Sequence, residues 1–332
     1  MLEFQEINAA TYTSLRRSIL KKMEEPREEV YFDLTIKDKQ GNIISEDGDP
    51  TIGIGIDIRK EEGREFAIGW MFGKYTNVGI KPDSDFRQDV RSAVAENSSY
   101  QTATSLQARL NQIMAARSGD SSAKFAFDDA AEMDRAFDQM ADTIYEKKID
   151  EWIRQDSNLP SDSIIKNSYE RLALFSIVFN GGKGTLGSAL KKALWNDDRP
   201  EAWYQIRYRT NKNQLPGLAK RRYFESQLFG LYEDRLTTGV TAEESAAVIS
   251  MYNKHGSAIK AYDAKYSRQV ERANVELVIP NLTPKVQGIA ESIGRARQTT
   301  IDTYIPAAKV NQILISSGLG DVLVGAASKN PS

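Results

Sequence analysis

The chain opens with a helical pattern of apolar and charged positions. From about Thr13 onward, apolar side chains that include Leu15, Ile19 and Leu20 fall on one helical face, and lysines and arginines fall on the other. Pro26 disfavours helical geometry in the residue before it. A first amphipathic helix is therefore predicted to end at about Glu25.

The pattern then changes to that of strands and turns. Residues 30–36 are rich in β-branched and aromatic side chains, which predicts a strand. Residues 39–42 form a turn signal, after which residues 43–44 resume the extended pattern. A second turn is expected at 47–50, and a further strand at 51–58, whose glycines indicate close approach of another chain segment.

Helical periodicity dominates the rest of the chain. Residues 60–122 are hard to interpret, although Trp70, Met71, Phe72 and Tyr75 indicate some packing. The run 168–180 is so apolar that it predicts a buried helix, and the glycines at 181–184 end it. Other helices are expected near 127–155, 187–196, 199–209 and 217–234.

The C-terminal third is also expected to be helical. Thr241–Glu244 has the pattern of a capping box, which opens a helix. A long polar helix is expected near 257–276, a weaker one near 283–300, and disorder at 328–332. His255 precedes a glycine, so we expect it in the last turn of a helix, where the helix dipole favours it.

Composition narrows the chemistry to a few side-chain types. The chain has 332 residues, a net charge of −2, no cysteine and a single histidine. The absence of cysteine excludes disulfides, thiol catalysis and cysteine metal sites. A single histidine is too few for a multi-histidine metal site and leaves only one candidate for a catalytic triad. The charge balance argues against nucleic-acid binding, no run is long enough for a membrane span, and the first residues do not resemble a signal peptide. We expect no metal and no cofactor, and any catalysis must use carboxylates, hydroxyls, amides or lysines.

Two carboxylates stand where glycoside hydrolysis would need them. That reaction takes one carboxyl that stays protonated and one that stays ionised, so the two need unlike surroundings. Glu24 closes the first helix, and Asp33 lies on the first strand. Thr51 begins the glycine-containing strand, where its hydroxyl could hold a water molecule between the carboxylates.

These residues resemble a known family. Glu24, Arg27, Tyr31, Asp33 and the run Thr51–Gly55 resemble the active-site signature of the phage-type (T-even) lysozymes, muramidases of glycoside hydrolase family 24. The resemblance implies that Glu24 is the general acid, Asp33 the second carboxylate and Thr51 the water-positioning residue. It also implies that Tyr31 lies at the substrate.

Two later blocks extend the resemblance in the right order. Residues 171–182 are similar to the family's central core helix, which would make Asn180 the amide that lines the glycan cleft. Asn180 could equally cap that helix before the glycines. Residues 215–225 are similar to the family's late helix with paired arginines.

The chain also departs from the family. The stretch from Asp33 to Thr51 is longer and brings in Asp47 and Asp49, either of which could replace Asp33 or contact substrate. Ile56 stands where the family usually has histidine. Residues 60–122 and those after 240 lie outside the matching blocks, so the resemblance implies no function for them.

The fold implied is α+β and two-lobed, with a small lobe that carries an extended hairpin and a larger helical lobe. Residues 1–235 would form the lysozyme-like catalytic domain, with an insertion at about 60–122, and residues 236–332 a helical extension. The implied substrate is the β-1,4 bond between N-acetylmuramic acid and N-acetylglucosamine in peptidoglycan glycan strands. By resemblance, the reaction would invert the anomeric carbon.

Two phage settings fit this interpretation. One is a lysozyme of the virion tail or baseplate, with residues 60–122 and 236–332 contacting other tail proteins, which the mildly acidic charge favours weakly. The other is an endolysin that is held in the host cytoplasm and then released to the periplasm. The rival functions are a lytic transglycosylase, which needs the glutamate but not the aspartate, and a structural phage protein with a non-catalytic lysozyme-like module.

A further cluster combines aromatic and basic residues. It could lie along an anionic glycan, or its aromatics could pack a helix while its arginines are solvated, which is the favoured interpretation. Its members are Trp203, Tyr204, Arg207, Tyr208 and Arg209.

Overall fold

The computed structural model forms two compact units, residues 8–164 and residues 1–7 with 165–332. Most of its elements are helices, and its described residues contain one three-stranded antiparallel sheet, which confirms the α+β class. The backbone alone is described for residues 34–37, 43–47 and 301–304. The structure describes residues 2–37, 40, 43–75, 82–95, 102–154, 165–212, 214–233, 240–279, 282 and 285–304.

The first helix, α1 (Ala9–Glu24), ends where Pro26 predicts. At its start, the Thr11 N–H donates a hydrogen bond to Asn8 Oδ1 at 2.9 Å. At its end, Glu25 takes a left-handed conformation with φ 47° and turns the chain toward the sheet. The end of α1 is thus fixed directly beside the first strand.

The sheet consists of β1 (Arg27–Lys37), β2 (Ile43–Gly53) and β3 (Ile56–Asp57), in that order. The turn expected at 47–50 is wrong, because β2 continues through these residues. Gly48 has φ 90°, and the register of β1 on β2 shifts nearby, so a bulge takes the place of the turn.

The strand expected at 51–58 is also interrupted. Gly53 and Gly55 both have positive φ, and the chain turns between β2 and β3. A Cβ on Gly53 would lie 2.7 Å from the ring of Phe127, so the close approach that the glycines indicated does occur there.

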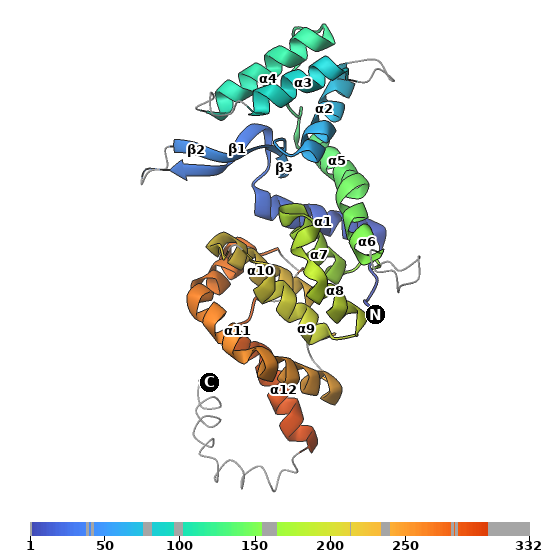
Figure 1. The fold of residues 1–332 in the computed structure, drawn as a ribbon, viewed down its shortest axis with the longest axis vertical. Coiled ribbons are helices and arrows are strands. Elements are labelled where there is room, and N and C mark those ends of the chain that lie inside the picture. Colours follow the sequence, from blue (N-terminus) through green and yellow to red (C-terminus); the bar gives the residue numbers. More distant parts are fainter. Residues whose placement is uncertain are drawn as a thin grey trace, which may run out of the picture. The chain divides into compact units, whose positions relative to one another are not determined.

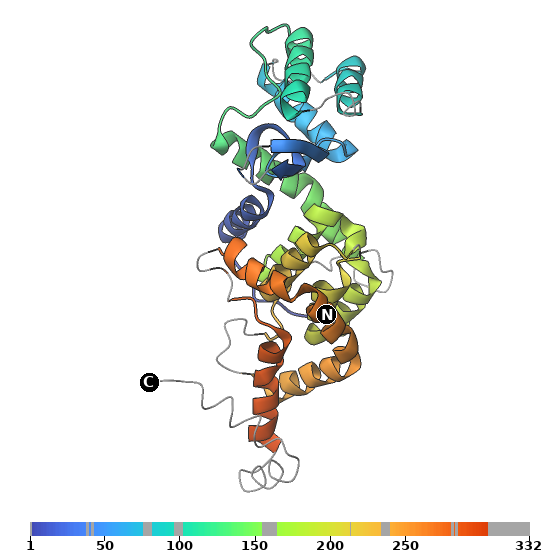
Figure 2. The same cartoon turned by 90° about the vertical axis from the view of Figure 1, so that its left-hand side faces the viewer.

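Three helices occupy the region that the sequence left uninterpreted. They are α2 (Glu61–Tyr75), α3 (Ser84–Ala95) and α4 (Ala103–Ser118). Figures 1 and 2 both show them on one side of the sheet, with α1 on the other. The start of α2 touches β3 so closely that a Cβ on Gly63 would lie 2.2 Å from the Asp57 carbonyl oxygen.

The helix expected at 127–155 is present but contains a wider turn. It runs as α5 (Ala130–Met140), a π-helical turn η2 (Ala141–Tyr145) and α6 (Glu146–Arg154). Arg16, Arg17 and Lys21 of α1 pair with its acidic side chains, and Arg16 is buried by doing so. Arg16 is 1% exposed and contacts Asp142 at 2.7 Å and Glu146 at 3.0 Å.

The other unit is built on the apolar helix that the sequence predicted. This helix is α7 (Tyr169–Gly181), which is buried along almost all of its length. The further helices near 187–196, 199–209 and 217–234 are also confirmed. They are α8 (Gly187–Trp195), α9 (Arg199–Tyr204) with a π-helical turn η4 (Gln205–Arg209), and α10 (Pro216–Phe229), and a short 3₁₀ turn η3 (Lys183–Thr185) follows α7.

The long helix α11 (Ala242–Glu276) corrects one expectation. It opens with the capping box of Thr241 and Glu244, as predicted, but it does not end near His255. The helix continues past Gly256 and kinks at Tyr266, so His255 lies in its interior. A second C-terminal helix, α12 (Ile289–Tyr304), follows, and the disorder expected at 328–332 falls outside the described residues.

Elements on both sides of residue 235 share one core in this unit. Ala219 and Tyr223 of α10 pack with Tyr266 and Ala273 of α11. Among the described residues, no helix is both long and apolar enough to span a membrane.

Candidate active site

Tyr31 joins the end of α1 to the sheet. Its hydroxyl donates a hydrogen bond to the Glu24 carbonyl oxygen at 3.2 Å, and its side chain is buried. The guanidinium of Arg27 lies 5.1 Å from the centre of the Tyr31 ring. On the neighbouring strand, Tyr31 is paired with Thr51. Four residues of the expected site therefore come together at the point where the helix meets the hairpin.

Two carboxylates act on Tyr31 electrostatically. Burial raises the pKa of its phenol most, the charge of Glu24 raises it further, and Asp33 adds a smaller effect of the same sign. A hydrogen bond with the Gly55 backbone and the charge of Arg27 oppose the rise. Tyr31 therefore remains a neutral hydrogen-bond donor at neutral pH, in surroundings that Glu24 and Asp33 share.

Asp33 is held by the neighbouring strand. Its Oδ1 accepts a hydrogen bond from the Asp49 N–H at 2.7 Å. Partial burial of the carboxyl raises the pKa of Asp33, and the negative charges of Asp49 and Asp57 raise it further, against the effect of this hydrogen bond. Asp33 as a whole is nevertheless classed among the exposed residues, so solvent reaches it.

The other described aspartates of this region carry cationic partners. Asp49 Oδ1 lies 2.7 Å from Arg59 Nη1, and Asp57 Oδ2 lies 3.0 Å from Lys60 Nζ. Asp33 forms no ion pair with any described residue. The side chain of Asp47, which the sequence also offered, lies outside the described residues, although its backbone pairs with Leu34 in the sheet.

Thr51 is buried at the centre of the sheet, 4% exposed. Its hydroxyl donates to the Asp49 carbonyl oxygen at 3.0 Å. The hydroxyl proton is therefore already used in this hydrogen bond. Towards a water molecule, Thr51 can act only as a hydrogen-bond acceptor. This is compatible with a water-positioning role in which the water donates to Thr51.

Tyr145 is a neighbour of the site that the sequence did not reveal. Burial raises the pKa of its phenol, and the charges of Glu62, Asp57 and Glu24 raise it further. It is the last residue of the π-helical turn η2, and Lys148 Nζ lies 4.9 Å from the centre of its ring. Such turns often occur at functional sites, but the apolar periodicity of 127–155 gave no sign of one.

Asn180 lies in the other compact unit, near the end of α7. Its Oδ1 is 3.5 Å from Nη2 of Arg222, a long hydrogen bond. Arg222 also pairs with the fully buried Glu225, which in turn accepts a 2.5 Å hydrogen bond from Ser176. The two later blocks of the resemblance, which contain Asn180 and Glu225, are thus joined by one polar network.

The aromatic and basic cluster on α9 and η4 is mainly a packing feature, but one part of the expectation is wrong. Arg209 is exposed as expected, whereas Arg207 is 0% exposed. The Arg207 guanidinium lies 4.8 Å from the Trp203 ring centre and 4.6 Å from that of Tyr223. Stacking on aromatic rings places Arg207 in the core, so it is not solvated.

His255 also has a defined environment. Its ring stacks on Tyr204 with centroids 3.8 Å apart, and its Nε2 lies 2.8 Å from Glu201 Oε2. These contacts join α11 to α9. The histidine therefore has a structural role between helices and none at a helix end.

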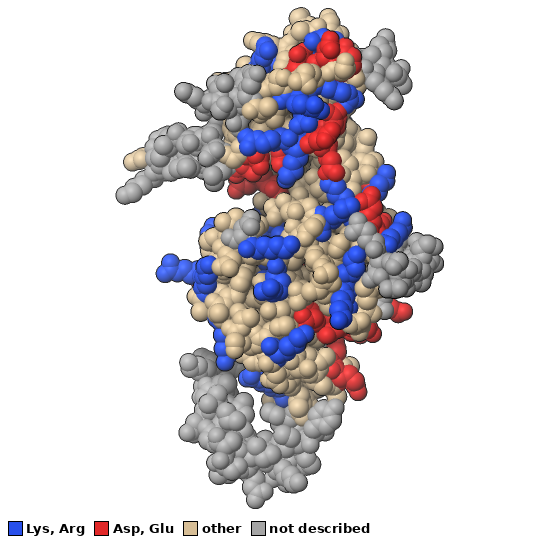
Figure 3. All heavy atoms as spheres, in the orientation of Figure 1, with Lys and Arg blue, Asp and Glu red and all other residues tan. Residues whose placement is uncertain are grey.

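On the face drawn in Figure 3, acidic side chains gather beside the sheet. Among the described residues, the acidic side chains whose charges raise the pKa values of Tyr31, Asp33 and Tyr145 are Glu24, Asp33, Asp49, Asp57 and Glu62.

Comparisons with protein-family models, with curated proteins and with solved structures found no match for this chain.

Proposed function

We propose that this protein is a muramidase, which hydrolyses the β-1,4 bond between N-acetylmuramic acid and N-acetylglucosamine in peptidoglycan. The observation that carries the proposal is the shared environment of Glu24 and Asp33 at Tyr31, one carboxylate from a helix end and the other from the adjacent strand. Two carboxylates in unlike settings are what glycoside hydrolysis requires.

The role of Glu24 is the one that the resemblance implies, and the role of Asp33 is also supported by its surroundings. Glu24 donates a proton to the leaving glycosidic oxygen. Asp33 is the described aspartate here without a cationic partner, so it is the one whose lone pairs remain available to take a proton from water. Thr51 accepts a hydrogen bond from that water, and neutral Tyr31 holds the helix end against the strand. Asp47 or Asp49 would also contact the glycan strand at the hairpin.

The Glu24→Gln variant tests the acid, and Glu25→Gln is its matched control. Both substitutions remove one negative charge at the same turn, but only Glu24 is assigned to proton transfer. Loss of a general acid costs about 10²- to 10⁴-fold in rate, so Glu24→Gln should clear peptidoglycan at least about 100 times more slowly in a turbidity assay. Glu25→Gln should clear at the wild-type rate. Equal clearing by wild type and Glu24→Gln would remove Glu24 from the mechanism.

Product analysis separates hydrolysis from its closest rival. A muramidase leaves a reducing sugar, and an inverting one releases it first as the opposite anomer, whereas a lytic transglycosylase leaves a 1,6-anhydro end. Asp33→Asn should reduce hydrolysis about as severely as Glu24→Gln. An Asp33→Asn protein that remains active and yields 1,6-anhydro ends would establish the transglycosylase. A wild-type chain that clears nothing would favour a structural module.

The setting that we propose is a phage particle, with the enzyme in the tail or baseplate. Residues 60–122 and 236–332 would supply contacts to neighbouring tail proteins, because they lie outside the blocks that resemble the lysozymes. Mass spectrometry of purified particles should detect the chain in the virion. Detection only in the soluble lysate would identify a free endolysin instead.

A further inference from the structure

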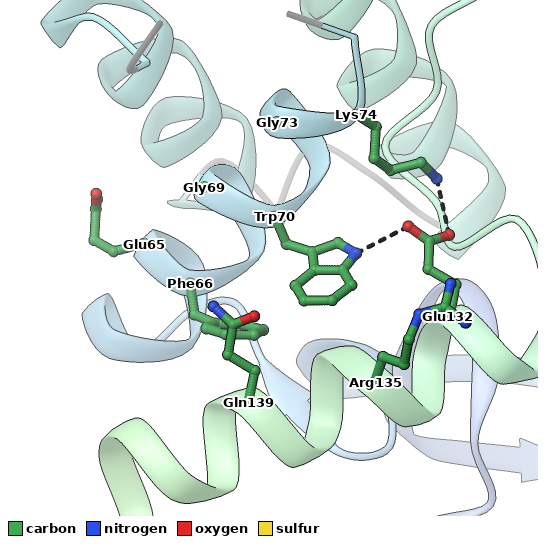
Figure 4. Close-up of a pocket in the computed structure, with 9 residues that line it drawn as sticks. All are labelled: Glu65, Phe66, Gly69, Trp70, Gly73, Lys74, Glu132, Arg135 and Gln139. Atoms are coloured by element: carbon green, nitrogen blue, oxygen red, sulfur yellow. Dashed lines mark hydrogen bonds and ion pairs between the residues drawn. The ribbon is translucent and has the colours of Figure 1, made fainter. Parts of the chain in front are cut away.

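A pocket lies between α2 and α5, and none of its lining residues belongs to the proposed catalytic group. Its volume is about 470 Å³, within the range of pockets that hold small ligands. Figure 4 shows side chains from both helices pointing toward it. The sequence indicated only a packing role for Trp70, Met71 and Phe72, and in the structure Met71 and Phe72 are indeed buried.

Two aromatic rings form the α2 wall of this pocket. Phe66 and Trp70 stack with centroids 6.0 Å apart and an angle of 28° between their planes. The indole N–H donates to Glu132 Oε1 at 2.9 Å, which fixes the orientation of the ring. Glu132 Oε2 accepts from Lys74 Nζ at 3.0 Å and from the Asp128 N–H at 2.6 Å. The aromatic wall is therefore held rigidly before any ligand arrives.

Glycines keep that wall open. Gly69 and Gly73 line the pocket on the same helix, and a Cβ on either would meet no atom within 4 Å. A glycine inside a helix destabilises the helix relative to alanine. No neighbouring atom requires glycine at either position. The absence of side chains there instead leaves open space in the pocket beside the rings of Phe66 and Trp70.

One positive charge at the edge of the pocket, that of Arg135, has no acidic partner among the described residues. Burial lowers the pKa of Lys74, but its hydrogen bonds with Asp128 and Glu132 outweigh this and raise it, so that charge is compensated. Glu65 pairs with Arg87. Arg135 is exposed and forms no hydrogen bond or ion pair with any described residue. Its guanidinium is therefore available for a carboxylate at the pocket mouth.

We infer that this pocket is a second saccharide subsite, which binds a peptidoglycan sugar whose attached peptide carries a carboxylate. A sugar ring presents C–H groups that pack on aromatic rings, and its polar substituents need hydrogen-bond donors such as the Gln139 amide. A guanidinium binds a carboxylate through paired N–H groups, which assigns Arg135 to the peptide. The choice of peptidoglycan rests on the proposed function, whereas the saccharide class follows from the pocket.

Fluorine NMR of the full chain can test this site by itself. The Glu24→Gln protein is labelled with 5-fluorotryptophan, and the signal of Trp70 is assigned by its loss in Trp70→Phe. A disaccharide–tetrapeptide from peptidoglycan should shift the Trp70 signal and leave that of the buried Trp152 in place. A neutral N-acetylglucosamine tetramer should shift the same signal with at least about 5-fold weaker affinity, since a charge-assisted pair contributes about 1 kcal/mol or more.

Two variants locate the contacts. Gly69→Leu fills the pocket and should weaken binding of both ligands by at least about 10-fold. Arg135→Ala should weaken only the ligand with the carboxylate, so that the two affinities become equal. Ala108→Leu introduces the same leucine side chain at an exposed position of α4 and should change neither affinity.

The outcomes separate this inference from the catalytic proposal. A Trp70 signal that does not move, or affinities that Gly69→Leu leaves unchanged, would overturn the subsite. Binding at Trp70 in a wild-type chain that clears no peptidoglycan would support the subsite and overturn the muramidase.

Discussion

Asp33 shows how far single residues can be interpreted from the sequence. The spacing of Glu24, Tyr31, Asp33 and Thr51 selected residues that do meet at one end of the sheet. The choice between Asp33 and Asp49 could not be made from the sequence, because it depends on where Arg59 lies. That arginine follows β3 and reaches back to Asp49, a contact that no local pattern indicates.

Stability should depend on pH in a way that identifies Asp33. Its folded pKa is raised above the ordinary value, so folding favours the protonated form. The ionised form is therefore penalised in the fold, and stability is lost as pH rises through this pKa. Asp33→Asn keeps an oxygen that can accept from the Asp49 N–H and removes the charge, so the variant should melt at a higher temperature than wild type at pH 7.

Thermal melting at several pH values checks this prediction. The advantage of Asp33→Asn should disappear below about pH 3, where wild-type Asp33 is protonated in both states. Asp49→Asn is the contrast, because it breaks an ion pair with Arg59 and should give no gain at pH 7. An Asp33→Asn protein less stable than wild type at pH 7 would show that the charge is favourable there.

At the scale of elements, most helices could be predicted and the sheet only in part. Amphipathic periodicity and end signals place α1, α7 and the start of α11 well. The turn expected at 47–50 failed because Asp, Gly and Pro also occur at bulges, and the sequence does not distinguish the two. The end expected at His255 failed because Gly256 is tolerated inside a helix that packs on α9.

Two glycines of α2 should respond in opposite directions to the same change. Gly63→Ala places a Cβ 2.2 Å from the Asp57 carbonyl oxygen, so the helix must move away from β3, at a cost of about 1–3 kcal/mol. Gly69→Ala meets no atom and should stabilise by about 0.5–1 kcal/mol. Urea unfolding of both variants measures the difference, and a neutral Gly63→Ala would mean that α2 and β3 are not in contact.

The contact between α9 and α11 should weaken in acid. Burial raises the pKa of Glu201, but hydrogen bonds from Gln205, His255 and Lys254 outweigh it and lower the pKa. A lowered folded pKa means that this contribution to stability is present above the ordinary value near 4.5 and is lost as pH falls through the folded pKa. Glu201→Gln should therefore melt at a lower temperature than wild type at pH 7 and at a similar temperature below about pH 3.

The control for Glu201→Gln is Glu271→Gln, an exposed glutamate of α11 without an ion pair to any described residue. It should melt like wild type at every pH. If Glu201→Gln also melted like wild type at pH 7, the three donors around Glu201 would contribute nothing to stability.

At the scale of the whole molecule, one compact unit is built from two separate parts of the chain. Residues 1–7 belong with residues 165–332, and the unit 8–164 is inserted between them. The Leu2 N–H donates to the Leu194 carbonyl oxygen at 2.8 Å, and the Ile7 N–H donates to that of Asn167 at 2.9 Å. The first seven residues have no periodicity, so the sequence could not predict that they complete a distant helical unit.

Phe4 is the side chain through which this connection can be tested. Its ring packs edge-on against Phe229 with centroids 6.0 Å apart, and the Arg199 guanidinium lies 5.4 Å from its centre. Phe4 is half-buried, so Phe4→Ala should cost about 2 kcal/mol, less than the roughly 3–5 kcal/mol of a fully buried phenylalanine. The loss should fall on the unit that Phe4 completes.

Hydrogen exchange followed by mass spectrometry assigns that loss to a unit. Amides of α8 and α10 should exchange about 10-fold faster or more in Phe4→Ala, since about 1.4 kcal/mol corresponds to tenfold in the opening equilibrium. Amides of α2 and α5 should exchange at the wild-type rate if the inserted unit opens independently. Faster exchange in both sets would show that the two units unfold together, and unchanged exchange in α8 and α10 would show that the N-terminal segment adds nothing to the unit it completes.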